Sequence, residues 1–282
     1  MGTLDGKVAF ITGVARGQGR SHAVRLAEEG ADIIGIDLCE QVPTVRYKMS
    51  TEADLAETER LVAATGRRMV SHKGDVRDLD GLREVVADGV EQLGRLDAVI
   101  ANAGILIGKY DEADAEATFR DQIDINLIGA WHTVEAALPV LRRQGEGGSV
   151  VITSSIAGLK GAVTGAGAGT LGYAAAKHGV VGLMRKYANL LAHERIRVNT
   201  VHPTGVDTPM LAEFHAEYAE FTEEFLDKLP PGDAARHSLG NPMPVQVIEP
   251  VDVSNAIVWL ISDAARYVTG ITLPVDAGFL NR

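Results

Sequence analysis

Short apolar runs that alternate with longer amphipathic segments constrain the fold of this chain more than any other feature. The runs lack a two-residue alternation of apolar and polar side chains, which is typical of strands buried on both faces of a parallel sheet. They lie at Val8–Ile11, Ile33–Ile36, Met69–Val70, Ala98–Ala101, Val150–Ile152, Ile196–Val201 and Ile271–Val275. Helical spacing is found at His22–Glu29, Asp54–Ala64, Leu79–Leu93 and Ala117–Leu141. This order predicts an α/β fold, a Rossmann-type doubly wound parallel sheet with right-handed crossovers.

No linker, repeat or low-complexity tail divides the chain, so we expect a single domain over residues 1–282. Two segments depart from the strand–helix rhythm, Leu38–Ser50 after the second strand and Thr208–Val251 after the sixth. The later segment predicts a small helical substrate cap at about 208–250, because long insertions near strand ends often bind ligands. Its aromatic residues fit a buried stripe or a pocket lining equally well: Phe214, Tyr218, Phe221 and Phe225.

Composition excludes several classes of function. A net charge of −11 gives no field that attracts phosphate backbones, so nucleic-acid binding is disfavoured. The single cysteine, Cys39, cannot form an internal disulfide and fits a reducing compartment. No apolar run approaches the roughly 20 residues of a membrane span, and Met1–Lys7 is not a secretory signal. These features together lead us to expect a cytoplasmic location. The histidines lack zinc-binding spacing, so we expect no metal.

A glycine-rich turn connects the first strand to the first helix. Its sequence is Thr12-Gly-Val-Ala-Arg-Gly-Gln-Gly19, with candidate cofactor residues Gly13, Arg16, Gly17, Gln18 and Gly19. Glycines at these positions allow a sharp turn and a close approach of the backbone to a pyrophosphate, while the helix N-terminus offers free N–H groups to the anion. The position between a strand and a helix is the context that dinucleotide binding requires.

The second strand ends at Asp37, which indicates which dinucleotide is bound. A carboxylate at this position accepts hydrogen bonds from both hydroxyls of an adenosine ribose and repels a 2′-phosphate. Arg16 favours the opposite choice, because a guanidinium beside the ribose binds such a phosphate. We expect direct contact with the carboxylate to dominate, which predicts NAD as the cofactor and leaves NADP as the alternative.

Tyr173 and Lys177 lie four residues apart near the start of a long predicted helix, so their side chains share one face. A phenol has a pKa near 10, too high for a general base at neutral pH. A cation about 4 Å away contributes approximately 4 kcal/mol at an effective dielectric of 20, but only about 1 kcal/mol in water. Lys177 can therefore lower the pKa of Tyr173 only in a partly desolvated cleft, with help from a charged nicotinamide.

Further polar residues follow other predicted strands. Thr153-Ser-Ser155 ends the fifth strand, so a serine hydroxyl there could bond the substrate oxygen beside Tyr173. Asn102, Ala103 and Gly104 end the fourth strand, where small residues let the backbone approach the cofactor. Asp75, with its neighbour Val76, follows the third strand and is placed to meet an adenine edge. Asn126 lies in the helical stretch that leads to the fifth strand.

Together these residues resemble the single-domain branch of the short-chain dehydrogenase/reductase family, over Lys7 to Gly278. The resemblance implies that Tyr173 is the general acid/base and that Lys177 lowers its pKa and holds the nicotinamide ribose. It implies that Ser155 polarises the substrate oxygen, since the second of the family's paired serines is the catalytic one. Asn126 would support a proton-relay water, and the nicotinamide half would contact three further residues: Pro203, Val206 and Thr208.

Two extended segments and two motifs resemble a narrower subgroup. The segments are Gly161–Gly169 and the loop after Asp37 with Cys39-Glu-Gln41; the motifs are Gly17–His22 and Thr204–Pro209. They are similar to the subgroup associated with mycofactocin, which includes carveol dehydrogenases. This resemblance implies tightly held NAD under a loop that acts as a lid, electrons passed to an external redox carrier such as mycofactocin, and an apolar cyclic alcohol as substrate. Family members are usually homotetramers.

The predicted reaction is therefore hydride transfer between NAD(H) and a secondary alcohol or ketone. Two other functions fit parts of the same sequence, an NADP-linked ketone reductase and a non-catalytic protein that binds NAD as a sensor or scaffold. The complete set of Ser155, Tyr173 and Lys177 argues against the sensor, because a sensor needs no proton donor. Trp131 and Trp259 lie in helical stretches and are expected in the core or at an interface.

Overall fold

Seven parallel strands form the centre of the molecule in the computed structural model, which describes residues 2–108, 114–161, 167–212 and 241–281. The spatial order is β3-β2-β1-β4-β5-β6-β7. This order confirms the doubly wound parallel sheet. The sequence order of the strands runs one way from β1 to β3 and the other way from β4 to β7, so it reverses between β1 and β4. The strands are β1 (Val8–Thr12), β2 (Asp32–Asp37), β3 (Met69–Lys73), β4 (Ala98–Ala101), β5 (Gly148–Thr153), β6 (Ile196–Pro203) and β7 (Thr272–Val275).

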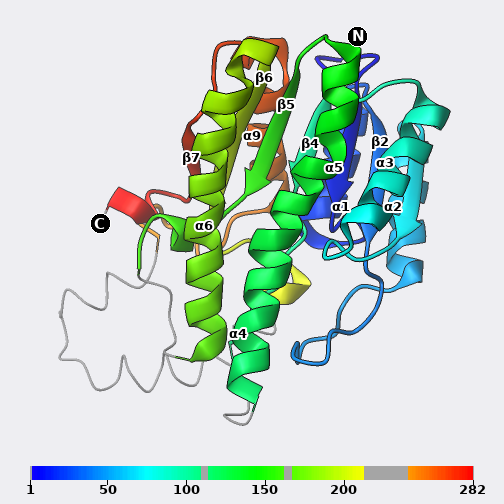
Figure 1. The fold of residues 1–282 in the computed structure, drawn as a ribbon. Helices are drawn as coiled ribbons and strands as arrows, with labels where there is room; N and C mark the ends of the chain where they lie inside the picture. Colours follow the sequence, from blue (N-terminus) through cyan, green and yellow to red (C-terminus); the bar gives the residue numbers. More distant parts are fainter. Residues whose placement is uncertain (1, 109–113, 162–166, 213–240, 282) are drawn as a thin grey trace.

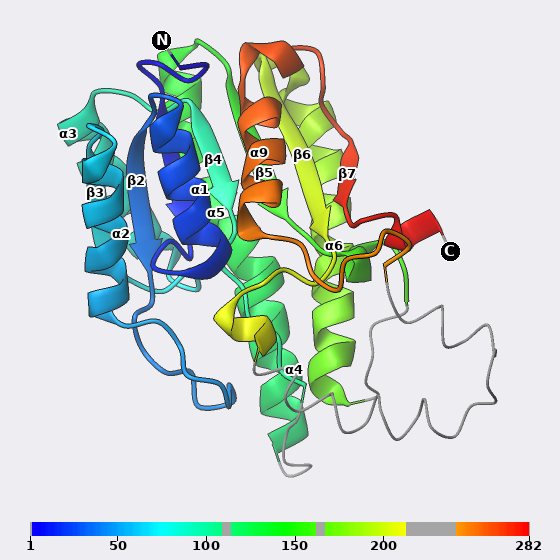
Figure 2. The ribbon, with the colours of Figure 1, turned by 180° about the vertical axis from the view of Figure 1, so that it is seen from behind.

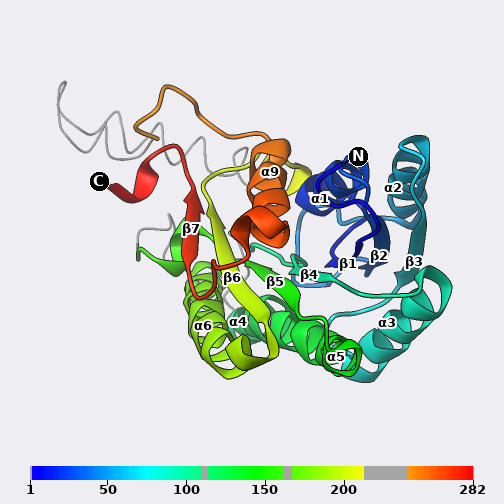
Figure 3. The same ribbon diagram turned by 90° about the horizontal axis from the view of Figure 1, so that it is seen from above.

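Helices cover both faces of the sheet (Figure 1). Seen from behind and from above, one face carries α1 (Gly17–Glu28), α2 (Glu52–Ala64) and α9 (Pro250–Ile261) (Figures 2 and 3). The other face carries α3 (Leu79–Leu93), α5 (Gly129–Gln144) and α6 (Ala168–Leu191) (Figure 3). Short 3₁₀ turns complete the described elements: η3 (Ile156–Gly158), η4 (Ala192–Glu194), η5 (Asp263–Ala265) and η6 (Phe279–Asn281).

The central strands bury side chains on both faces, which explains their continuous apolar sequence. Phe10 and Ile34 point into the cluster formed with α3, α5 and α6. Ile11 and Ile33 point into the opposite cluster, formed with α1, α2 and α9. Neighbouring residues of one strand thus lie in different cores, and both must be apolar.

The helical stretch predicted at 117–141 contains a change of helical type. It begins as α4 (Ala115–Ile123), continues through the π-helical turn η2 (Asp124–Ile128) and becomes α5 without interruption. The N–H of Gly129 donates to the carbonyl of Asp124, five residues earlier. A π turn carries one more residue per turn than an α-helix and often lies at a functional site. Asn126 lies at its centre.

The predicted cap and the two tryptophans can be compared with the structure only in part. Of the proposed cap, residues 208–212 and 241–250 are described, while the four aromatic residues Phe214, Tyr218, Phe221 and Phe225 lie outside the described residues. Trp131 and Trp259 are 37% and 40% exposed on α5 and α9, which excludes a core position within the single chain. In the described part of the chain, no helix combines the length and apolar composition that a membrane span requires.

Candidate active site

A cleft of about 910 Å³, including its open mouth, lies at the carboxyl ends of the strands where the sheet order reverses. This is the position at which doubly wound sheets bind ligands. The turns that follow β1, β2, β3 and β4 form its walls. Most of the predicted cofactor residues line it: Gly13, Arg16, Gly17, Gln18, Gly19, Asp37, Asp75, Val76, Asn102, Ala103, Gly104 and Thr208.

The glycine turn has the geometry of an anion cradle. Gly13 has a φ of +70°, and a Cβ on it would lie 2.8 Å from the Cα of Ala103. A Cβ on Gly19 would lie 1.9 Å from the carbonyl oxygen of Gly13. Arg16 caps α1 without a side-chain hydrogen bond, and the first turn contains no acidic residue. The N–H groups at the start of α1 therefore face the cleft without a protein anion, as a bound diphosphate requires.

Asp37 connects the glycine turn to the loop that follows β2. One carboxylate oxygen accepts from the N–H of Ala15 at 2.9 Å. The other accepts from the hydroxyl of Ser50 at 2.5 Å and from the N–H of Cys39 at 3.3 Å. Three donors thus hold a carboxylate that lines the cleft and is only 8% exposed. The side chain is fixed at the position where the sequence predicts contact with an adenosine ribose.

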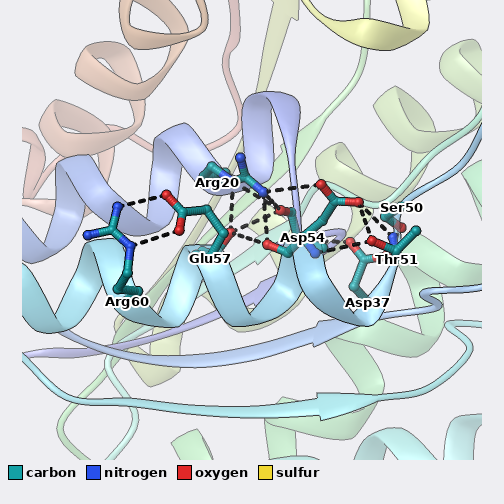
Figure 4. Close-up of polar contacts among 9 residues, drawn as sticks. Arg20, Asp37, Ser50, Thr51, Asp54, Glu57 and Arg60 are labelled. Carbon is teal, nitrogen blue, oxygen red and sulfur yellow. Dashed lines mark hydrogen bonds and ion pairs between the residues drawn. The ribbon is translucent and has the colours of Figure 1, made fainter.

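Arg20 reinforces this corner from α1 (Figure 4). Its guanidinium donates to the carbonyl of Ala15 at 2.6 Å and to the carbonyl of Asp54 at 2.8 Å. Asp54 and Thr51 form the capping box at the start of α2, directly after the loop. The start of α1, the start of α2 and the end of β2 are therefore joined by hydrogen bonds, which stiffens one wall of the cleft.

The extended loop 38–50 folds over the cleft instead of extending into solvent. Val42 and Tyr47 line the cleft and are buried in an apolar cluster with Ile105, which follows β4. The amide of Gln41 donates to three carbonyls within the loop, the shortest of these bonds measuring 2.6 Å. The hydroxyl of Thr44 donates to the carboxylate of Asp121 on α4 at 2.6 Å. The loop is thus tied to the opposite side of the cleft.

Asp75 and Val76 line the cleft after β3, as predicted. The carboxylate of Asp75 accepts from the guanidinium of Arg77 at 2.6 Å, and Arg77 also reaches Asp121 at 3.3 Å. Burial alone would raise the pKa of Asp75, but the hydrogen bonds from Arg77 outweigh it and hold that pKa below its ordinary value. Asp75 therefore stays ionised beside the predicted adenine position.

Gly104 joins the cleft to the predicted catalytic residues. A Cβ on it would lie 2.6 Å from Oδ1 of Asn126 and 3.6 Å from Nζ of Lys177. The amide of Asn102 donates to the carbonyl of Thr12 at 3.1 Å, which holds the end of β4 against the end of β1. The missing side chain at Gly104 thus lets Asn126 and Lys177 pack against the end of β4, and Tyr173 lies on the same helix as Lys177, α6.

Tyr173 and Lys177 lie together on α6, close to the end of β5. Lys177 is 4% exposed, its Nζ donates to the carbonyl of Thr153 at 2.9 Å, and it lies 5.5 Å from the centre of the Tyr173 ring. Burial lowers the pKa of Lys177 to about 8, so its ammonium group is mainly charged at neutral pH. Burial also raises the pKa of Tyr173, while a hydrogen bond with the Ser155 side chain opposes that increase.

The two adjacent serines have different surroundings. The hydroxyl of Ser154 is buried and donates to the carbonyl of Lys177 at 2.9 Å, so it supports α6. Ser155 is partly exposed, and its hydroxyl accepts from the N–H of Ala157 at 3.2 Å and bonds Tyr173. The structure therefore brings Ser155, and not Ser154, to the phenol.

Asn126 is buried beneath the segment that follows β4. Its amide donates to the carbonyls of Ile105 and Gln122, each at 3.0 Å, and its Oδ1 accepts from the N–H of Ile105 at 3.1 Å. The side chain thus holds Ile105 in place next to the cleft. The water that Asn126 is expected to support remains a prediction.

Comparison with known proteins agrees with this geometry. The family model described as enoyl-(acyl carrier protein) reductase matches residues 13–280. The (−)-trans-carveol dehydrogenase of Rhodococcus erythropolis is 46% identical over 279 residues, 99% of each chain. The chain belongs to the short-chain dehydrogenase/reductase family. The predicted resemblance to this family is confirmed.

Two further matches cover almost the whole length of this short-chain dehydrogenase/reductase. An uncharacterised oxidoreductase of Mycobacterium tuberculosis is 53% identical over 279 residues, 99% of this chain and 98% of that protein. The crystal structure of a carveol dehydrogenase from Mycobacterium avium in complex with NAD is 47% identical, with a TM-score of 0.88 and complete coverage of both chains. The similarity therefore extends to the carveol dehydrogenases.

Two of the three residues predicted for the nicotinamide half do not line this cleft. Pro203 ends β6, and Val206 is 5% exposed and forms a bridge with Ile248. Thr208 does line the cleft, and its methyl group would lie 3.4 Å from a Cβ on Gly17. The bridge to Ile248 draws Val206 into the core, whereas Thr208 reaches the glycine turn.

Sequence reasoning missed several residues of the short-chain dehydrogenase/reductase site. The loop 38–50 supplies Val42, Tyr47 and Met49 to the cleft wall. Apolar residues within a long connection between two elements are the sequence feature that could have indicated this role. His202 gives no signal in the sequence beyond being a histidine without zinc-binding spacing. His202 is fully buried next to Ser155, and no local pattern predicts that contact.

Proposed function

We propose that this protein is an NAD-dependent oxidoreductase that interconverts a secondary alcohol and a ketone. The observation that carries the proposal is the group formed by Tyr173, Ser155 and Lys177, in which Lys177 lies next to Gly104 of the cleft wall. In such a group the serine hydroxyl can bind a substrate oxygen, and the phenol, with the ammonium group nearby, can exchange a proton with that oxygen. The family membership of the chain supports the same reaction.

The residues present fit NAD. The turn Gly13–Gly19 would hold the diphosphate, Asp37 the adenosine ribose, Asp75 and Val76 the adenine, and Lys177 the other ribose. When bound, NAD supplies the hydride acceptor, and its positive nicotinamide adds to the charge near Tyr173. The NAD complex of the carveol dehydrogenase from Mycobacterium avium supports this assignment.

In the oxidation direction, Tyr173 takes the hydroxyl proton of the alcohol while the carbinol hydrogen leaves as hydride. Burial works against this step because it raises the pKa of the phenol. The ammonium of Lys177, in a desolvated position 5.5 Å from the ring, supplies part of the opposing charge. Ser155 donates to the substrate oxygen, and Asn126 positions the segment at Ile105 and supports the relay of the proton to solvent.

Asp37 favours NAD over NADP in this proposal. Its carboxylate is fixed by three donors and cannot move away from a 2′-phosphate without loss of those bonds. Arg16 lines the same cleft and is the residue that would support NADP, the alternative cofactor. A fixed, nearly buried charge has the larger effect, since it is less screened than the partly exposed guanidinium of Arg16.

We propose an apolar cyclic alcohol, similar to carveol, as the substrate. Two carveol dehydrogenases similar to this chain support this choice, at 46% and 47% identity over nearly the full length. A helical cap at about 208–250, within the single domain 1–282, would close over that substrate. Pro203 and Val206 remain proposed contacts of the nicotinamide half of NAD and not of the substrate.

The loop 38–50 supports the further proposal that NAD is held tightly. A cofactor in the cleft would lie beneath Val42 and Tyr47, and its release would disturb the bond from Thr44 to Asp121. An enzyme that keeps its cofactor must return the electrons to an external carrier, for which we propose a small redox molecule such as mycofactocin. Purified protein that carries NAD(H) would support this part.

We also propose a homotetramer that works in the cytoplasm. Phe119, Trp131 and Trp259 are each more than one-third exposed, on α4, α5 and α9. We propose that subunit contacts cover these three side chains. The single cysteine is consistent with a reducing compartment.

The test of the proposed function is Tyr173→Phe, assayed at 340 nm with a panel of secondary alcohols and an artificial electron acceptor. We expect turnover to decrease at least about 1,000-fold, because the proton acceptor is lost. Binding of NAD, followed by calorimetry, should change less than about threefold. A non-catalytic NAD sensor would instead show no turnover in the wild type, and an NADP-linked reductase would prefer NADP in steady-state kinetics.

A further inference from the structure

His202 is buried in the sheet directly behind Ser155. It is the second-last residue of β6 and is 0% exposed. Its Nδ1 lies 2.7 Å from the carbonyl oxygen of Ser155, and its Nε2 lies 2.8 Å from the hydroxyl of Thr200. Both ring nitrogens therefore have a partner, although no solvent reaches them.

The partners determine which nitrogen carries the proton. A carbonyl oxygen only accepts, so Nδ1 of His202 must donate to Ser155. Burial lowers the pKa of His202 to about 4, with further lowering by Lys177 and His178, against the opposing effect of the bond to Ser155. The ring is neutral at physiological pH, so Nε2 carries no proton and accepts from Thr200.

The carbonyl of Ser155 is held from two sides. The N–H of Gly158 donates to it at 2.9 Å from the 3₁₀ turn, and His202 donates at 2.7 Å from the sheet. The backbone of Ser155 is extended, with φ −166° and ψ 166°, and its hydroxyl projects from there toward Tyr173. A change in the direction of this carbonyl would therefore rotate the serine hydroxyl relative to the phenol.

We propose that His202 is a positioning residue, whose imidazole fixes the backbone of Ser155 and thereby aims the serine hydroxyl at the substrate oxygen. The inference rests on the proposed alcohol–ketone chemistry and deepens it. His202 does not touch the reacting atoms, and no proton passes through it. The carbonyl of Ser155 fixes the tautomer of His202, and the hydroxyl of Thr200 satisfies the other ring nitrogen. Strand β6 holds the imidazole in place, and Ser155 carries the effect to the substrate.

Two amide variants separate this role from simple packing. In His202→Asn the amide nitrogen can occupy the position of Nδ1 and still donate to Ser155. In His202→Gln the longer side chain places the amide at the level of Nε2, so that donor is lost. Both variants are polar and neutral, which makes them matched controls for each other.

The experiment measures kcat, KM and NAD affinity for wild type, both amide variants, Ser155→Ala and the double variant Ser155→Ala/His202→Gln. We expect His202→Gln to lower kcat roughly 10- to 100-fold, with NAD affinity unchanged, because a small misplacement of a reacting group is costly. His202→Asn should retain kcat within about threefold. In the Ser155→Ala background, His202→Gln should lower kcat less than about twofold, since the group it positions is absent.

The outcomes separate the two proposals. If Ser155→Ala keeps wild-type turnover, the proposed catalytic group is wrong, and the role of His202 fails with it. If Ser155→Ala loses turnover but His202→Gln does not, only the positioning role is overturned. Equal losses from His202→Gln with and without Ser155 would also overturn it, as would equal kcat values for the Asn and Gln variants. Melting temperatures of all variants identify any general loss of folding.

Discussion

The N–H of Ala15 donates a 2.9 Å hydrogen bond to the carboxylate of Asp37. This bond joins the glycine turn after β1 to the end of β2, the next strand of the sheet. The residue that we propose selects the cofactor therefore also shapes the turn that we propose binds the diphosphate. Changes at Asp37 must be interpreted with both roles in mind.

We predict that Asp37→Asn weakens the preference for NAD over NADP about 30-fold. The amide keeps an acceptor for Ala15 but loses the charge, and hydrogen bonds to a charged group contribute about 1.5–3 kcal/mol. The ratio of kcat/KM for the two cofactors measures the effect. Asp32→Asn is the control, since Asp32 lies at the other end of β2 and pairs with Arg67 and Arg68. An unchanged ratio in Asp37→Asn would remove the argument for NAD.

The two adjacent serines should respond in opposite ways to replacement by alanine. We predict that Ser155→Ala lowers kcat by about 100-fold or more, because it removes a donor to the substrate oxygen. Ser154→Ala should keep kcat within about threefold but lower the free energy of unfolding by about 1 kcal/mol, the contribution of its bond to Lys177. Steady-state kinetics and urea unfolding test both statements. A larger loss of turnover in Ser154→Ala would reverse the assignment.

The lowered pKa of Lys177 predicts a pH dependence. Burial disfavours the ammonium group and brings its pKa to about 8, so the charge is present below pH 8 and is lost as the pH rises through that value. We expect kcat/KM for NADH in ketone reduction to be constant from about pH 6 to 7.5 and to decrease above pH 8. Lys186→Gln, an exposed change on the same helix, should leave the profile unchanged. A wild-type profile that stays flat to pH 9.5 would contradict this assignment.

The bond between Thr44 and Asp121 should control how long NAD stays bound. We predict that Thr44→Val releases NADH about tenfold faster, because a hydrogen bond to a charged group is lost when the loop 38–50 is closed. Fluorescence of bound NADH after dilution into excess NAD measures the rate. Thr65→Val, which removes a hydroxyl at the end of α2, serves as the control. Equal release rates would show that the loop does not retain the cofactor.

Most of the fold could be predicted because its signals are local or periodic. The strand predicted at Ala98–Ala101 and the helix at Leu79–Leu93 match the structure at both ends. The π turn at Asp124–Ile128 was not predicted, since its residues have ordinary helical propensity and the change of hydrogen bonding leaves no pattern in the sequence.

The site was predictable where a residue ends a strand or faces its helical neighbour, as Asp37 and Tyr173 do. Contacts made across the fold were not predictable. Val206 pairs with Ile248, and His202 meets the carbonyl of Ser155, 47 residues earlier in the chain. Such pairs are brought together only by the sheet, so the sequence around each residue carries little information about them.

The π turn between α4 and α5 makes chain length a part of the site. The additional residue of the π turn rotates the helical residues before Gly129 relative to a regular α-helix. In that orientation the amide of Asn126 donates to the carbonyl of Ile105. A substitution cannot remove this rotation, whereas deletion of one residue would turn Asn126 by about 100° around the helix axis. Variation in this segment is therefore restricted first in the number of its residues and only then in their chemistry.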